Sequence, residues 1–148
     1  FPYTTLFRSE AAGPGQKVIT MREKNNLVFY PHQISDGTLR FLALAAIAHG
    51  AVAAPLLAIE EPENGISPAR LFQLVELLRN HSHTGQQIIL TTHAPYLVDC
   101  LQPEELIVFT RSSGPTTRIK LTAADITQRQ QEFGPLGELW VSGALQDG

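Results

Sequence analysis

Residues 56–65 read L-L-A-I-E-E-P-E-N-G, a short apolar run that ends in two adjacent carboxylates. An apolar run of this length, bounded by turn residues, is typical of a strand in a parallel sheet whose two faces are covered. Binding and catalytic groups of such sheets collect at the carboxyl ends of the strands. Residues 55–59 are therefore predicted to form a central strand, with Glu60 and Glu61 at its functional end.

A second apolar strand is predicted at residues 88–90, which lead into T-T-H and end at His93. Ser67 and Pro68 form a good helix start between the two strands, an N-cap followed by proline at the first helical position. The helix then places leucine and valine on one stripe. This strand–helix–strand order predicts a unit with a right-handed crossover. The acidic pair and the histidine should then lie at the same edge.

An acidic pair beside a histidine fits nucleotide hydrolysis. One carboxylate can hold Mg²⁺, directly or through water, while the next orients or deprotonates an attacking water. The histidine can contact the γ-phosphate. The alternative is a solvated acidic loop containing Glu61, Pro62 and Glu63, and for an isolated E-E-P the two readings are evenly matched. The T-T-H at the end of the next strand favours hydrolysis.

Residues 34–40, I-S-D-G-T-L-R, open an apolar helix predicted over residues 36–50 and expected to be buried on most of its surface. Serine and glycine at a helix N-terminus can form an anion site from free N–H groups and the positive end of the dipole. The simpler alternative is capping by Ser35 or Asp36. Arg40 could reach a phosphate, an opposing subunit or a salt-bridge partner.

The whole chain, 148 residues of which 43% are hydrophobic, is consistent with one globular domain. A net charge of −3 gives no overall attraction to nucleic acid, and the one cysteine suits a reducing cytosol. No run is long and apolar enough for a bilayer span, and without a basic segment followed by an apolar core at the start, no signal peptide is expected. A loop is predicted at residues 10–16, strands at 17–22, 27–30, 106–110 and 116–121, the last two as a hairpin, and helices at 95–100 and 123–131.

Several motifs together resemble one family. Residues 34–44, I-S-D-G-T-L-R-F-L-A-L, resemble the signature motif of ABC-type ATPases in the form found in RecF/SMC-like and OLD-like AAA family ATPases. Residues 56–65 resemble their Walker B strand and D-loop, residues 89–95 their switch-histidine segment, and residues 137–143 the end of such ATPases. The resemblance implies an α/β P-loop NTPase fold. This chain would be its C-terminal lobe, a mostly parallel sheet flanked by helices with a peripheral C-terminal β-hairpin.

The resemblance also implies ATP and Mg²⁺ as cofactors and assigns roles to the motif residues. Glu61 would activate water, and Glu60 would take the position where most relatives carry the Mg²⁺-associated aspartate. His93 would contact the γ-phosphate in its own subunit. Composite sites at a dimer interface would add residues that bind ATP from the opposing subunit or lie at the D-loop near the seam: Ser35, Asp36, Gly37, Thr38, Asn64 and Gly65.

The phosphate-binding G-x-x-x-x-G-K-[ST] motif is absent from the sequence. Residues 1–9, F-P-Y-T-T-L-F-R-S, resemble a translated sequencing adapter, and the alternative is a native N-terminal strand. We therefore expect residues 1–16 to be artefactual or disordered and residues 17–148 to be the C-terminal lobe of an ABC-like ATPase domain. This chain by itself should not turn over ATP.

The expected partners follow from the same resemblance. They are a second copy in an ATP-dependent homodimer, and DNA or a partner nuclease reached through other segments. The expected location is the cytoplasm, with no membrane contact. The alternative function is a non-catalytic interaction module that keeps the ATPase fold.

Overall fold

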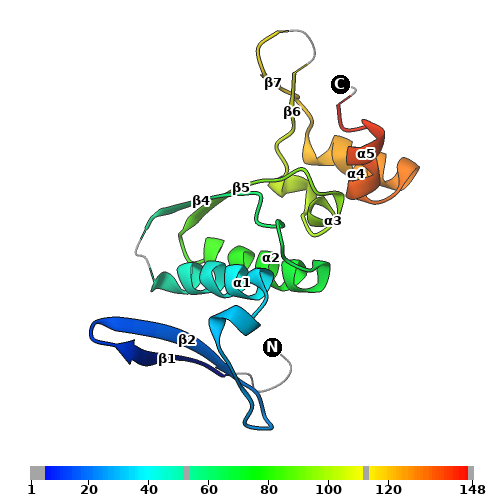
Figure 1. The fold of residues 1–148 in the computed structure, drawn as a ribbon. Coiled ribbons are helices and arrows are strands. Elements are labelled where there is room, and N and C mark those ends of the chain that lie inside the picture. The colour runs from blue at the N-terminus through cyan, green and yellow to red at the C-terminus, as the bar shows by residue number, and fades with distance from the viewer. Residues whose placement is uncertain (1–5, 52–53, 112–113, 147–148) are drawn as a thin grey trace.

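The computed structural model describes residues 6–51, 54–111 and 114–146 (Figure 1). Its strands are β1 (Leu6–Gly13), β2 (Gln16–Arg22), β3 (Val28–Phe29), β4 (Leu56–Glu60), β5 (Gln87–Thr91), β6 (Phe109–Thr110) and β7 (Thr117–Arg118). Its helices are α1 (Asp36–Ala46), α2 (Pro68–Ser82), α3 (Pro95–Val98), α4 (Ala123–Phe133) and α5 (Leu136–Ser142). Shorter helical turns are η1 (Pro31–Gln33), η2 (Ile47–Ala51, a π-helical turn) and η3 (Pro103–Glu105).

The central unit is β4–α2–β5, as the sequence predicts. The two strands run parallel, with Leu56 opposite Gln87 and Glu60 opposite Thr91. Helices α1 and α2 lie together on one side of this pair (Figure 1). The α/β fold class is thereby confirmed, with the parallel pair at its centre; β1–β2–β3 and β6–β7 pair antiparallel.

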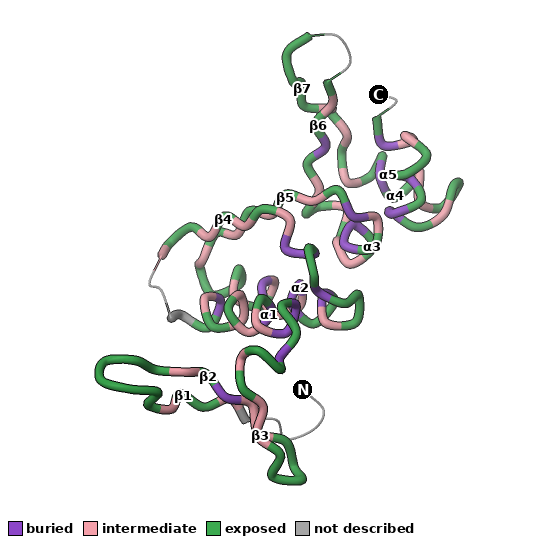
Figure 2. Tube along the Cα trace, in the orientation of Figure 1, coloured by how far each residue is buried: buried purple, intermediate pink, exposed green. Residues whose placement is uncertain are grey.

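The main core lies between the strand pair and the two helices (Figure 2). Helix α2 buries the predicted stripe of Leu71, Leu74, Val75 and Leu78. Alternate residues of β4 and β5 pack onto the same cluster: Leu57, Ile59, Ile88 and Leu90. Helix α1 contributes Phe41, but only Gly37, Thr38 and Phe41 of α1 are buried, so the expectation of a helix buried on most of its surface is wrong.

The other face of the strand pair is open. Leu56 is 46% exposed and Ile89 is 48% exposed, and both belong to the alternate set that points away from the helices. In the described part of the chain β5 pairs only with β4. Among the described residues, helices pack against one face of the pair only, so the expectation of a strand covered on both faces is wrong there.

A second cluster joins the C-terminal elements. Val98 of α3, Ile126 of α4 and Leu136 and Leu139 of α5 are buried together with Leu145. The backbone N–H of Gly137 donates to Asp99 Oδ1 at 2.6 Å, which ties α5 to the end of α3. The predicted hairpin is present as β6–β7 and projects away from the helices (Figure 1).

The N-terminal region differs from the expectation. Residues 6–13 form β1, which pairs antiparallel with β2, so the loop predicted at residues 10–16 is wrong except at the turn between the strands. The disorder expected for residues 1–16 is likewise not found from residue 6 onward, while residues 1–5 lie outside the described residues. Whether residues 1–9 are native stays a prediction.

Arg79 of α2 fastens the main core to the segment after α3. Its guanidinium donates to both carboxylate oxygens of Glu105, at 2.7 and 2.8 Å, and to the Cys100 carbonyl at 2.8 Å. This hydrogen bonding holds the pKa of Glu105 below its ordinary value. A lowered pKa means that the pair stabilises the fold above the pH at which an unfolded glutamate titrates.

We expect Glu105→Gln to lower the free energy of unfolding near neutral pH by about 1 kcal/mol, because the pair is charge-assisted but partly exposed. The loss should disappear as the pH falls through the lowered pKa of Glu105, where the wild-type carboxylate is protonated as well. Urea unfolding at a series of pH values measures this. Glu104→Gln, at the exposed neighbouring position, is the control; an equal loss in both variants would contradict the assignment.

Candidate functional site

Glu61 is fixed through its backbone and its side chain. Its N–H donates to the Thr91 carbonyl at 2.9 Å, which continues the β4–β5 ladder by one residue. Its own carbonyl accepts from Arg40 Nη2 at 3.0 Å, and its Oε2 accepts from Asn64 Nδ2 at 2.7 Å. Arg40 thus binds a backbone carbonyl in this structure. The sequence predicts a phosphate, an opposing subunit or a salt-bridge partner for it, but not a backbone carbonyl. Glu61 is held at the end of β4 by groups from β5, α1 and its own loop.

The backbone of Glu61 is strained. Its φ is +44°, in the left-handed region that a residue with a Cβ rarely adopts. Such conformations persist only where the surroundings enforce them, and they cluster at functional sites. Here the anchors on the N–H, the carbonyl and Oε2 supply that enforcement. The side chain stays 37% exposed and open to a ligand.

His93 lies beside Glu61, as the sequence predicts for two neighbouring strand ends. Its Nε2 is 3.7 Å from Glu61 Oε1, and its side chain is 79% exposed. Its carbonyl accepts from the Trp140 indole Nε1 at 3.3 Å, so α5 contacts the loop after β5. An accessible imidazole next to an accessible carboxylate can act together on one substrate.

Glu63 is the residue of this region that sequence analysis missed as a functional candidate. The sequence assigns Glu63 no functional role and offers a solvated acidic loop as the alternative for it, but the residue is only 5% exposed. Its Oε1 accepts from the Thr92 hydroxyl at 2.6 Å and from the His93 N–H at 3.2 Å. The donors come from the loop after β5, about thirty residues away, so no local sequence signal reveals them.

The hydroxyl groups of Ser35 and Thr38 lie together at the N-terminus of α1. Ser35 is the N-cap: its Oγ accepts from the Thr38 N–H at 3.3 Å and lies 2.7 Å from Thr38 Oγ1. Arg70 of α2 donates to Thr38 Oγ1. The structure thereby decides between the two caps that the sequence allowed, because Ser35 takes the role and Asp36 stands exposed in the first turn.

Gly37 brings this helix end against the loop that follows β4. A Cβ built on Gly37 would lie 1.7 Å from the Gly65 carbonyl oxygen, so only glycine fits there. Gly65 itself has φ +77°, which favours glycine for conformational reasons. The pair places Ser35, Asp36 and Thr38 next to the loop that carries Glu61 and Asn64.

Glu60, the predicted metal ligand, is exposed at the end of β4 opposite Thr91. Among the described residues, no group of three or more His, Cys, Asp or Glu side chains could hold a metal ion. Mg²⁺ does not require such a group, since it is commonly held by one or two carboxylates together with substrate phosphates. An accessible carboxylate oxygen fits that donor set.

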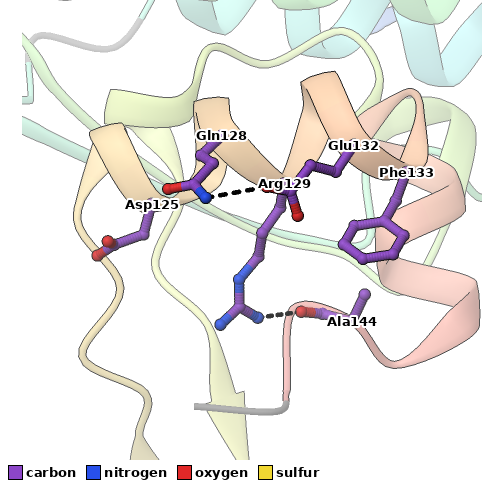
Figure 3. Close-up of a pocket in the computed structure, with 6 residues that line it drawn as sticks. All are labelled: Asp125, Gln128, Arg129, Glu132, Phe133 and Ala144. Carbon is purple, nitrogen blue, oxygen red and sulfur yellow. Dashed lines mark hydrogen bonds between the residues drawn. The ribbon is translucent and has the colours of Figure 1, made fainter.

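The structure has a cleft beside His93 and a hollow away from the motif residues. A cleft of about 530 Å³ runs along β5, is mostly apolar, and has Thr92, His93 and Trp140 among its lining residues. A hollow of about 390 Å³ lies between α4 and the C-terminal segment (Figure 3). In it Arg129 donates to the Ala144 carbonyl, which joins α4 to the segment after α5, and Gln128 donates to Glu132 within α4. No motif residue lines this hollow.

Comparison with known proteins agrees with the geometry. Residues 3–99 match the family model described as "AAA domain, putative AbiEii toxin, Type IV TA system". The chain therefore belongs to this family of AAA domains. The match begins inside the segment that resembles an adapter, and it includes Ser35, Glu61 and His93.

Curated relatives are ATP-binding proteins of the ABC type. A "Putative ABC transporter ATP-binding protein" of Methanosarcina acetivorans is 28% identical over 118 residues, which are 70% of this chain and 42% of that protein. The "Nickel import ATP-binding protein LarO" of Lactiplantibacillus plantarum is 31% identical over 99 residues, 67% of this chain and 39% of that protein. The chain spans about two fifths of the length of these relatives.

A solved structure shares the fold. It comes from work on ATP-driven dimerization and DNA-stimulated activation of SMC ATPases, and it superposes with a TM-score of 0.68 at 17% identity. The match covers 86% of this chain and 80% of that one. The predicted P-loop NTPase fold of the ABC type is confirmed. Within the described residues no helix is both long and apolar enough to cross a membrane.

We expect Gly37→Ala to destabilise the fold by about 2 kcal/mol, the usual range for overpacking. Alanine ordinarily favours a helix over glycine by about 1 kcal/mol, so a net loss would isolate the clash with the Gly65 carbonyl. Urea unfolding measures it. Gly114→Ala is the control, because a Cβ there meets nothing within 4 Å. A Gly37→Ala variant as stable as the wild type would refute the close contact.

Proposed function

We propose that this chain forms the C-terminal, catalytic-carboxylate lobe of an ABC/SMC-like ATPase that hydrolyses ATP in composite sites at a dimer interface. The observation that carries the proposal is the pairing of Glu61 with His93, 3.7 Å apart at the ends of two adjacent parallel strands. Membership in an AAA family and ATP-binding relatives support it.

Glu61 is the proposed general base. Its Oε2 is oriented by Asn64, while Oε1 faces the imidazole of His93, which leaves the carboxylate fixed but accessible. A fixed carboxylate can accept the proton of a water that attacks the γ-phosphate, without rearranging during the reaction. His93 is the proposed γ-phosphate contact, since its imidazole can donate a hydrogen bond from an exposed position.

Glu60 is the proposed Mg²⁺ residue. The ion, when bound with the nucleotide, would neutralise charge on the phosphates. Glutamate is one methylene longer than the aspartate that most relatives carry, so a water-bridged contact suits it. The neighbouring carboxylates therefore have separate proposed roles, one toward the metal and one toward the attacking water.

Ser35, Gly37 and Thr38 are proposed to bind the γ-phosphate of ATP held by the opposing subunit. Ser35 is exposed at a capped helix N-terminus, where N–H groups and the dipole favour an anion. Asn64 and Gly65 are proposed to lie at the seam. Because Gly37 packs against Gly65, a phosphate bound at the helix end would be sensed by the loop that carries Glu61.

The phosphate-binding lysine is proposed to lie on a segment that this chain does not include. The sequence contains no G-x-x-x-x-G-K-[ST], and the chain spans about two fifths of its curated relatives. Tests of hydrolysis therefore use the protein encoded by the complete gene. DNA or a partner nuclease is the proposed macromolecular partner of that protein, through segments outside this lobe.

We expect Glu61→Gln in the complete protein to keep ATP binding but to lower hydrolysis by at least about a hundredfold. Glutamine is nearly isosteric but cannot take up the proton of the water. Glu60→Gln should instead weaken the Mg²⁺-dependent part of nucleotide binding. Titrations with and without Mg²⁺, beside steady-state hydrolysis, separate the two. Normal turnover by Glu61→Gln would overturn its role as the base.

We expect dimers of Ser35→Arg alone and of Glu61→Gln alone to be inactive, and their mixture to regain activity. A mixed dimer keeps one intact site, formed by Glu61 of one subunit and Ser35 of the other. An equal mixture should reach about a quarter of the wild-type rate, since half of its dimers are mixed. A mixture that exchanges subunits but stays inactive would place the whole site on one subunit.

A further inference from the structure

Glu63 is a buried carboxylate that the proposed hydrolysis does not use. It is 5% exposed, and its Oε2 is buried without a hydrogen-bond partner among the described residues. Burying a carboxylate costs several kcal/mol, and an apolar side chain would fill the same space without that cost. A costly group at this position needs a role, and its two accepted hydrogen bonds indicate which one.

Both hydrogen bonds reach the loop that carries His93. Oε1 accepts from the Thr92 hydroxyl at 2.6 Å and from the His93 N–H at 3.2 Å. Thr92 Oγ1 in turn accepts from the Ala94 N–H at 3.0 Å. One carboxylate oxygen therefore determines the path of the backbone between β5 and α3.

The carbonyl side of His93 is held as well, because Trp140 donates its indole N–H to the His93 carbonyl at 3.3 Å. The backbone of His93 is thus fixed before and after its Cα, while its imidazole is 79% exposed. With the backbone fixed and the side chain free, the reach of the imidazole is set by the anchors. Glu61 lies within that reach, with its Oε1 3.7 Å from the imidazole Nε2.

We propose that Glu63 is a positioning residue, which holds the His93 backbone so that the imidazole stays beside Glu61. It couples the loop after β4 to the loop after β5, and it acts by accepting hydrogen bonds rather than by its charge. The consequence for hydrolysis rests on the proposed function, whereas the consequence for the His93 loop does not.

Two variants of Glu63 separate the effect of its hydrogen-bond acceptor from the effect of its side-chain size. Glu63→Gln keeps an oxygen that can accept from Thr92 and His93, and it removes the charge. Glu63→Met keeps the length and fills the space but accepts neither bond. We expect amide hydrogen exchange at His93, measured on this chain by NMR, to be accelerated about tenfold in Glu63→Met and to change little in Glu63→Gln. The single indole N–H signal, from Trp140, should shift in the same variant.

Urea unfolding of the same samples shows whether faster exchange is local or global. If Glu63→Met does not fold, Thr92→Val replaces it, since valine removes the hydroxyl donor while Glu63 stays in place. His93 exchange should then accelerate in Thr92→Val. Unchanged amide exchange at His93 in the folded variant overturns the proposal. Equal acceleration of that exchange in Glu63→Gln and Glu63→Met also overturns it, because the charge itself would then be responsible.

In the protein encoded by the complete gene, Glu63→Met should lower kcat by about tenfold or more while leaving the Kd for ATP unchanged, because a misplaced group slows the chemical step. Glu63→Gln should stay within about threefold of the wild type. Absence of hydrolysis in the wild type would refute the proposed function and leave the exchange result standing. Normal hydrolysis by Glu63→Met, in a wild type that hydrolyses ATP, would refute only the positioning role.

Discussion

The contact between Gly37 and Gly65 determines how the rest of the site is built. The two backbones are so close there that a Cβ on Gly37 would collide with the Gly65 carbonyl, so the N-terminus of α1 lies directly on the loop after β4. That approach brings Arg40, one helical turn further along, within 3.0 Å of the Glu61 carbonyl. Helix α1 and the loop after β4 therefore pack directly on one another, and a shift of α1 would change the surroundings of Glu61.

Glu61 shows what this constraint achieves. Its left-handed backbone costs energy, on the order of 1–3 kcal/mol for such a residue. Hydrogen bonds that Glu61 accepts from Arg40 and Asn64, and the one that its N–H donates to the Thr91 carbonyl of β5, offset that cost. The result is a partly exposed carboxylate whose Oε1 lies 3.7 Å from His93 Nε2. A relaxed backbone at this position would carry the side chain away from His93.

The elements that sequence analysis predicted are those with local signals. The apolar runs gave β4 and β5, and Ser67-Pro68 marked the start of α2 within one residue. The juxtaposition of Glu61 and His93 followed from the rule that parallel strands end at one edge. These inferences needed only hydrophobic periodicity and turn chemistry.

The features that were missed depend on contacts across the fold. Glu63 looks solvated in sequence because its donors follow a different strand, and Arg70 looks like a surface residue although it reaches Thr38. Residues 10–13 of β1 are predicted as a loop because their Ala-Ala-Gly stretch has low strand propensity, whereas pairing with β2 determines their conformation. Local patterns do not contain such information.

The open face of the β4–β5 pair has a consequence for handling this chain in solution. Leu56, Ala58 and Ile89 face outward there, and among the described residues β5 has only β4 beside it. The other edge of β5 is therefore unpaired in the described part of the chain. Soluble proteins usually protect unpaired strand edges with lysine, proline or a covering helix. None of the residues of β5 is charged or a proline. Concentrated samples of the isolated chain will therefore tend to associate strand to strand, and dilution or added charge on β5 will oppose it.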